Sequence, residues 1–458
     1  MKRALALACL LVSSAPSWAV SPYDLFFRSE SDAMLLGGGD VPGEITGRPE
    51  VDRPASLLET GRPVVRLDLC SQTPVQLTDD TGTLGRWHSD SVKLTLVQPV
   101  DERWAVGLQV ETVDDSIWYD NAQSGYRIDA ATDEYTVAGA YRISEDWTAA
   151  AGWTWGSLDA SGRGEAVTDM LDLPADNPRW PTLSIDQHSF TLAASHRGDR
   201  FQGGALIGWS DPDATLRVTR DVYDYSAPMD SGTDWYEVWG GYRDGSDQWW
   251  AGLRDMQSDG SGSIFLGAGG RGDTSLNLSD QTFSVGWREE TKRTITQAQI
   301  DWREADFATY EQGYAGLLPG ISTDIYTFRG GGRTAVQSVR LGHQRALADC
   351  WSWAAAGGAH FADVNGRTVL KRITGIGSNP VVESESTVDD GTVQLWSLTL
   401  GLVYEREDLR VALTGTGGYA ETNDAFDDAF TYGGDGPDEG GTSLEVEPLF
   451  TLGVEWHL

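Results

Sequence analysis

The sequence predicts an all-β fold: a transmembrane up-and-down antiparallel β-barrel of about 16 strands, with 14 or 18 strands also compatible. Three observations predict it. Segments of about ten residues alternate between apolar and polar side chains, as strands do when lipid covers one face and water the other. Short polar turns alternate with long Gly- and Asp-rich connections, which predicts short periplasmic turns and long extracellular loops. No stretch reaches the ~18 apolar residues of a membrane-spanning helix.

The N-terminus predicts export. Residues 1–19 read as a signal peptide, with Lys2 and Arg3 before a short apolar core and a small-x-small cleavage site at residues 17–19. Residues 20–61 follow without clear periodicity and contain three consecutive glycines. They form either a periplasmic tail or a plug folded into the lumen, and we favour the tail. The barrel is expected to occupy residues 62–458.

Net charge and cysteine content exclude nucleic acid as a partner and a disulfide scaffold as the source of stability. A formal net charge of -35 argues against nucleic acid. Outside the signal peptide the cysteines are Cys70 and Cys350, too few for a disulfide scaffold. In a 16-strand layout these two lie at opposite rims, so we expect no disulfide between them.

The predicted strands can be followed along the chain. Clear examples of alternation begin at Trp104, Tyr135 and Trp147, and further segments carry the pattern to the end of the chain. Trp and Tyr recur near the strand ends, where aromatic girdles meet the membrane surface. In the last segment the even-numbered positions from 444 to 458 are apolar and the odd-numbered ones are mostly polar. Leu449 is the exception.

The C-terminus carries a more specific signal. Thr451, Gly453, Trp456 and Leu458 form the pattern T-x-G-x-x-W-x-L, which resembles the C-terminal assembly signal of bacterial outer-membrane β-barrel proteins, with porins as the nearest label. Leu458 stands where that family usually ends in Phe or Trp. The resemblance implies location in the outer membrane of a Gram-negative bacterium, contact with its lipid and lipopolysaccharide, delivery by periplasmic chaperones and insertion by the barrel-assembly machinery. It also implies a homotrimer as one oligomeric state.

Strand parity predicts which charged side chains line the lumen. The pore-lining candidates are Arg142, Glu237, Arg243, Arg254, Arg288, Asp301, Arg303, Arg340, His360 and Arg410. One interpretation is a basic strip that favours anions, because charged pore linings set selectivity. The simpler interpretation, which we favour, is that the arginines mark the periplasmic rim or pair with neighbouring acids.

The sequence predicts neither a catalytic residue nor a cofactor. His188 and Ser189 are adjacent, but neighbours on a strand face opposite sides and cannot act as base and nucleophile. His360 faces the lumen alone and is expected to be a solvated or hydrogen-bonded side chain. The acidic loops, such as 114–133 and 421–443, lack the ligand spacing of a calcium loop, although divalent cations could bind there.

These observations favour an outer-membrane channel for passive diffusion of small hydrophilic solutes or ions. Two alternatives remain. One is a non-conducting anchor, adhesin or barrel partner of a surface complex. The other is a transporter of hydrophobic substrates with an N-terminal hatch.

Overall fold

A computed structural model describes residues 34–36, 41–46, 48–79, 82–120, 125–163, 182–220, 223–266, 270–315, 324–374, 381–423 and 443–458. The strands form one closed antiparallel barrel in which every strand pairs with its neighbours in sequence. The last strand pairs with the first, from Val64 opposite His457 to Thr78 opposite Ser443. Closure leaves no strand edge in hydrocarbon, where an unpaired backbone group costs several kcal/mol. The predicted 16-strand barrel is confirmed.

The strands are β1 (Val64–Asp79), β2 (Gly82–Pro99), β3 (Trp104–Asp120), β4 (Gly125–Arg142), β5 (Trp147–Arg163), β6 (Thr182–Arg197), β7 (Phe201–Arg220), β8 (Tyr223–Asp244), β9 (Asp247–Leu266), β10 (Gly270–Glu290), β11 (Thr294–Ala315), β12 (Asp324–Ala348), β13 (Trp351–Thr374), β14 (Val381–Arg406), β15 (Leu409–Thr422) and β16 (Ser443–His457). Among the described residues before β1 lie the short helix α3 (Gly43–Thr46) and the 3₁₀ helix η2 (Pro54–Glu59). No helix in the described part of the chain is long and apolar enough to cross a membrane.

The strands are longer than the sequence indicates. They run for 14 to 26 residues rather than about ten. Much of each predicted long loop therefore continues the ladder; residues 114–120, for example, pair with residues 125–131. The acidic loop 421–443 lies mostly outside the described residues. The reason for the difference is that a strand can rise beyond the bilayer with polar side chains on both faces, and such a segment carries no alternation.

Two aromatic girdles mark the bilayer on the outward face. The girdle near the short turns contains cross-strand pairs such as Trp104 with Tyr141 and Trp351 with Tyr404, whose ring centroids lie 4.5 and 5.0 Å apart. About eight residues further along the strands, a second girdle contains Phe190 with Trp209 and Phe361 with Trp396. This spacing matches the apolar band of an outer-membrane barrel.

Carboxylates encircle the barrel just beyond the second girdle. On six strands an acid lies two residues past a girdle aromatic, on the same outward face: Asp133, Asp211, Asp234, Glu304, Asp363 and Glu421. These side chains mark the outer boundary of the hydrophobic surface. The strands continue past it into the extracellular space.

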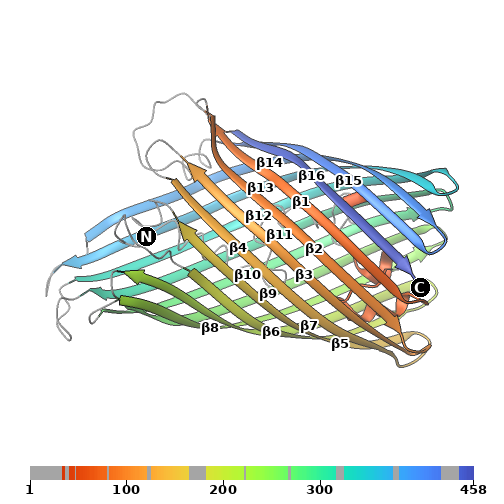
Figure 1. Cartoon of the computed structure of the whole chain (residues 1–458), viewed down its shortest axis with the longest axis horizontal. Coiled ribbons are helices and arrows are strands. Elements are labelled where there is room, and N and C mark those ends of the chain that lie inside the picture. The colour runs from red at the N-terminus through yellow and green to blue at the C-terminus, as the bar shows by residue number, and fades with distance from the viewer. Residues whose placement is uncertain are drawn as a thin grey trace.

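The N-terminal helices lie inside the barrel, at the end where the chain terminates (Figure 1). That end also holds the short turns, so it is the periplasmic end. Cys70 lies within β1 and Cys350 in the turn before β13, and no disulfide joins them. The expectation that they lie at opposite rims is wrong, because Cys350 is at the periplasmic end and Cys70 is only six residues into a strand that starts there.

Candidate functional site: the occupied lumen

The described residues between 34 and 60 (34–36, 41–46 and 48–60), here called the lumen segment, pack against inward-facing side chains of the barrel wall. Their local shape follows from prolines. Pro42 precedes α3 and its carbonyl accepts hydrogen bonds from the amides of Ile45 and Thr46 at 2.9 and 3.2 Å. Pro54 opens η2, a position that needs no amide donor. Ser56 then ties the turn together, because its hydroxyl accepts from the Glu50 amide at 2.7 Å and donates to the Arg53 carbonyl at 2.9 Å.

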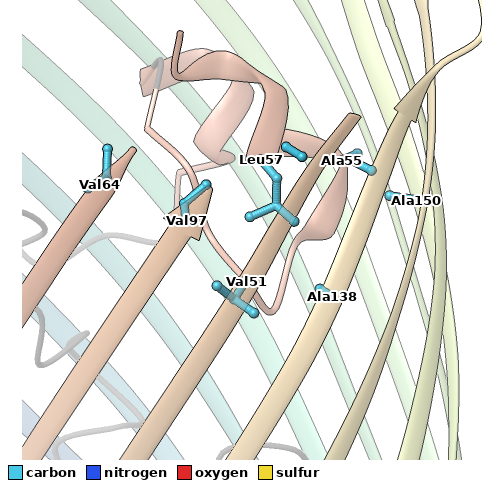
Figure 2. Close-up of a cluster of buried hydrophobic side chains, with 9 residues drawn as sticks. Val51, Ala55, Leu57, Val64, Val97, Ala138 and Ala150 are labelled. Carbon is cyan, nitrogen blue, oxygen red and sulfur yellow. The ribbon is translucent and has the colours of Figure 1, made fainter. Parts of the chain in front are cut away.

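The first contact lies on the wall formed by β2 to β5. Val51 and Leu57 are fully buried there against small inward side chains, among them Ala138 and Ala150 (Figure 2). Gly107 makes the close approach possible, since a Cβ at that position would lie 2.9 Å from Val51 Cγ2 and 3.0 Å from Leu57 Cδ2. The small residues of this wall therefore form a shallow seat for the lumen segment.

The second contact lies across the lumen on β8 and β9. Val41 and Ile45 cluster with the indoles of Trp239 and Trp250. These indoles lie flat over wall glycines: a Cβ on Gly204 would meet Trp239 Nε1 at 2.6 Å, and a Cβ on Gly286 would meet the Trp250 ring at 2.0 Å. The glycines thus let large aromatic side chains lie against the wall and leave width for the lumen segment.

The third contact lies on β13 to β16 and on β1, the strands around the junction where the last strand pairs with the first. Leu35 packs with Ala354, Val403 and Ala412 on β13 to β15. Met34 is buried in a cluster that includes Cys70 of β1 and Leu449 of β16. The lumen segment therefore touches three sectors of the wall.

Charged groups join the lumen segment to the wall at two further points. Arg53 donates from Nη2 to Glu237 Oε2 on β8 at 3.0 Å, and both side chains are largely buried. Arg197, at the end of β6, pairs with Glu59 of η2. Buried charges need such partners, because an isolated ion is costly to remove from water.

The predicted pore-lining residues fall into pairs rather than into one continuous strip. Asp301 pairs with Arg340, Arg303 with Asp280 at 3.0 Å, Arg288 with Glu290 at 3.0 Å and Arg410 with Glu405 at 3.8 Å. Arg254 lies opposite Glu237 in the ladder, and the buried His360 ring shares a 2.8 Å hydrogen bond with the Ser338 hydroxyl. Arg142 is half-buried near the periplasmic turn, whereas Arg243 is exposed there.

The apolar side chains of the inward face were not predicted from the sequence. Leu206, Trp235, Met256 and Leu278 form a buried cluster on β7 to β10, with Phe307 of β11 beside it. No described residue of the lumen segment belongs to this cluster. The available signal was a strand that is apolar on both faces: Trp235 and Trp239 point inward while Tyr236 and Val238 point outward.

The C-terminal residues lie as their parity predicts. Trp456 is exposed on the outward face, whereas Thr451 is buried and its hydroxyl shares a hydrogen bond with that of Thr414 on β15. Gly453 is buried on the inward face, and the Leu458 amide donates to the Pro63 carbonyl at 2.9 Å. Among the described residues, no group of three or more His, Cys, Asp or Glu side chains is placed to hold a metal ion.

A closed 16-strand barrel with an apolar outward belt between aromatic girdles defines an integral β-barrel of the bacterial outer membrane. No protein-family model and no curated protein matches the sequence. Among solved structures, the chain is similar to the Pseudomonas putida toluene transporter TodX, with a TM-score of 0.46 and 11% identity over 94% of this chain and 100% of that one. It is also similar to the Ralstonia pickettii toluene transporter TbuX, with a TM-score of 0.45 and 11% identity over 95% and 100%. For a FadL homologue of Pseudomonas aeruginosa the TM-score is 0.44, with 11% identity over 94% and 99%.

Proposed function

We propose that this protein is an outer-membrane channel for small apolar or amphipathic solutes, with the lumen segment as its hatch. The observation that carries the proposal is the buried apolar cluster on the inward face, formed by Leu206, Trp235, Met256 and Leu278. A channel for hydrophilic solutes has a polar, water-filled interior. An inward apolar surface instead favours solutes that gain about 25 cal/mol per Å² on leaving water.

The position of the lumen segment supports the same function. Its contacts with three sectors of the wall leave a solute little room to pass, so transport requires the segment to move. A periplasmic tail, which the sequence favoured, would not need the buried contacts of Met34, Leu35 and Leu57. Open diffusion of hydrophilic solutes is accordingly the weaker proposal.

The first experiment compares solute classes. Proteoliposomes would be tested for uptake of the uncharged aromatic dye N-phenyl-1-naphthylamine and, by swelling, for passage of arabinose. We expect dye uptake well above that of protein-free vesicles, and little swelling. Fast swelling with no gain in dye uptake would instead support a hydrophilic pore, and neither activity would support a non-conducting anchor.

The second experiment locates the route. Met256→Lys places a charge in the inward apolar cluster and should lower dye uptake about tenfold. Ser284→Lys is the matched control, because Ser284 is also inward and half-buried but lies outside the cluster. Equal dye uptake by both lysine variants would contradict the route.

A deletion tests the hatch. Removing residues 22–60 should open a large ionic conductance in planar bilayers, and that conductance would also show that the barrel itself is intact.

A further inference from the structure

A row of hydroxyl side chains crosses the inward face of the barrel beside the apolar cluster. One member lies on each strand from β4 to β9, and neighbouring members are opposite each other in the ladder: Thr136, Thr154, Ser189, Ser210, Thr233 and Ser258. The next inward step toward the periplasm places Gly208, Trp235 and Met256 opposite one another. This hydroxyl row therefore borders the apolar cluster on its extracellular side.

Five members of the hydroxyl row have hydrogen-bond partners. Hydroxyl–hydroxyl bonds of 3.0 Å join Thr136 with Thr154 and Thr233 with Ser258, and the Ser210 hydroxyl donates to Gln187 Oε1 at 3.0 Å. Ser189, in the middle of the row, is different. Its side chain is 2% exposed, and its hydroxyl makes no hydrogen bond with any described residue. The amide nitrogen of Gln187, a side chain that is also 2% exposed, has no partner in the described chain either.

These two groups point to a partner from outside the chain. Nearly all buried polar groups in proteins are hydrogen-bonded, because an unsatisfied group bears the cost of leaving water without a bond in return. Ser189 and Gln187 lie two positions apart on the inward face of β6, so their Cα atoms are about 7 Å apart. The Ser189 hydroxyl can donate or accept, and the Gln187 amide nitrogen donates. Together they suit a ligand oxygen, such as that of a hydroxyl or carbonyl group.

The apolar cluster reaches close to these groups. The Trp235 indole extends over Gly208 of β7, where a Cβ would lie 2.1 Å from Trp235 Cζ2. Ala193, four residues from Ser189 on the inward face of β6, packs against the same cluster. One small molecule can therefore contact both the apolar side chains and the unpartnered polar groups.

Charge distinguishes the edges of the apolar cluster. Ionic side chains of both signs border it on the periplasmic side and on β10 and β11: Glu237, Arg254, Asp280 and Arg303. The hydroxyl row on the extracellular side is neutral, and Glu134, which accepts a hydrogen bond from Thr136 at 3.4 Å, is acidic. A neutral polar group is therefore favoured over a carboxylate at this edge.

We propose that the solutes of this channel are amphiphiles with one neutral hydroxyl or carbonyl group. Its oxygen bonds to Ser189 and Gln187 while the apolar body covers Trp235 and Met256. The inference rests on the proposed function and narrows its solutes, which are apolar or amphipathic, to this one type. The hydroxyl row thus selects among molecules that the apolar cluster alone would bind equally.

The test measures binding of three naphthalenes to the purified protein in non-ionic detergent by equilibrium dialysis, with binding to protein-free micelles subtracted. Naphthalene has no polar group, 2-naphthol has a hydroxyl that is neutral at pH 7 because phenols titrate near pH ~10, and 2-naphthoate has a carboxylate. All three share one ring system, so their apolar contacts are matched. We expect 2-naphthol to bind about fivefold more tightly than naphthalene, the effect of one hydrogen bond, and 2-naphthoate no more tightly than naphthalene.

Variants assign the preference to the hydroxyl row. Ser189→Ala should remove the advantage of 2-naphthol, leave naphthalene binding unchanged and keep the unfolding midpoint, because this hydroxyl has no partner among the described residues. Gln187→Leu serves if Ser189→Ala fails to fold. Ser195→Ala is the matched control, since Ser195 is also buried and inward on β6 but lies six residues closer to the periplasm. Met256→Lys should weaken binding of all three compounds.

Four results would overturn the proposal: no binding of any naphthalene, equal affinity for 2-naphthol and naphthalene, tightest binding of 2-naphthoate, or an undiminished 2-naphthol preference in Ser189→Ala. Binding is measured without transport. A lack of dye uptake in proteoliposomes would therefore contradict the proposed function and not the assignment of this polar site.

Discussion

Arg53 and Glu237 form a buried ion pair that joins the lumen segment to strand β8, with 3.0 Å between Nη2 and Oε2. Arg53 also reaches the Val41 carbonyl and Glu50 at 3.5 Å, so one side chain organises the segment and attaches it to the wall. Glu237 lies on the inward face between Trp235 of the apolar cluster and Trp239, which the segment covers. The pair thus stands where the proposed solute surface meets the proposed hatch.

Breaking this pair should loosen the hatch. Glu237→Gln removes the charged partner of Arg53 on the wall and leaves Glu50 of the segment beside it, and losing one member of a buried pair costs about 3 kcal/mol. We expect bursts of larger conductance in planar bilayers. Combining Arg53→Gln with Glu237→Gln should be milder than either single change, because two amides can hydrogen-bond. The exposed pair of Arg62 and Asp408 is the control, and Arg62→Gln should leave conductance unchanged. Additive effects of the two single changes would show that the pair is not coupled.

The glycine seat offers a steric test of the same contact. Gly107→Val would place atoms within 3 Å of Val51 and Leu57, and overpacking of this kind costs about 1–3 kcal/mol. We expect faster proteolysis of the lumen segment from the periplasmic side, with the barrel still resistant. Gly240→Val is the matched control, because a Cβ there meets nothing within 4 Å. Equal proteolysis of the two variants would argue against the seat.

The carboxylates beyond the second girdle predict where the bilayer ends. Single cysteines at Val137 and Asp133 would be introduced in a Cys70→Ser, Cys350→Ser background and exposed to a membrane-impermeable maleimide in proteoliposomes. Both positions face outward on β4, four residues apart, on either side of Tyr135. We expect labelling at position 133 and strong protection at 137, since maleimide reacts with thiols in water. Protection at both positions would raise the boundary above Tyr135.

Most of the barrel could be predicted because the residue pattern of each strand depends only on what surrounds its own two faces. Lipid on one face and water on the other impose alternation, and strand number followed from counting alternating segments such as the one that begins at Trp147. The strand extensions could not be predicted, because beyond Asp133 or Asp211 both faces meet water and alternation ends. The inward arginines were identified by parity, and the structure pairs several of them, such as Arg303 with Asp280, with acids.

The lumen segment was harder to predict for a different reason. Its contacts join positions far apart in the chain, such as Arg53 with Glu237, and no periodicity within residues 34–60 signals them. The wall does carry a signal in its exceptions to alternation. Leu449, the one apolar residue on the polar parity of the last strand, lies inward against the cluster that buries Met34. Apolar residues on the wet face of a barrel strand therefore indicate an apolar contact inside the lumen, with the folded segment at Leu449 and, as proposed above, with a solute at Met256.

Leu449 allows that interpretation to be tested. Leu449→Ala would leave a cavity beside Met34 and Cys70, and a buried Leu-to-Ala change costs about 2–5 kcal/mol. In a Cys350→Ser background we expect the Cys70 thiol to react with a water-soluble maleimide about tenfold faster, because its cover is weakened. Leu449→Met keeps the volume and should change the rate little. Leu452→Ala is the control for general loosening of β16, because Leu452 lies three residues after Leu449 and faces outward. If Leu449→Ala and Leu452→Ala accelerate labelling equally, the thiol reports on the strand and not on the lumen segment.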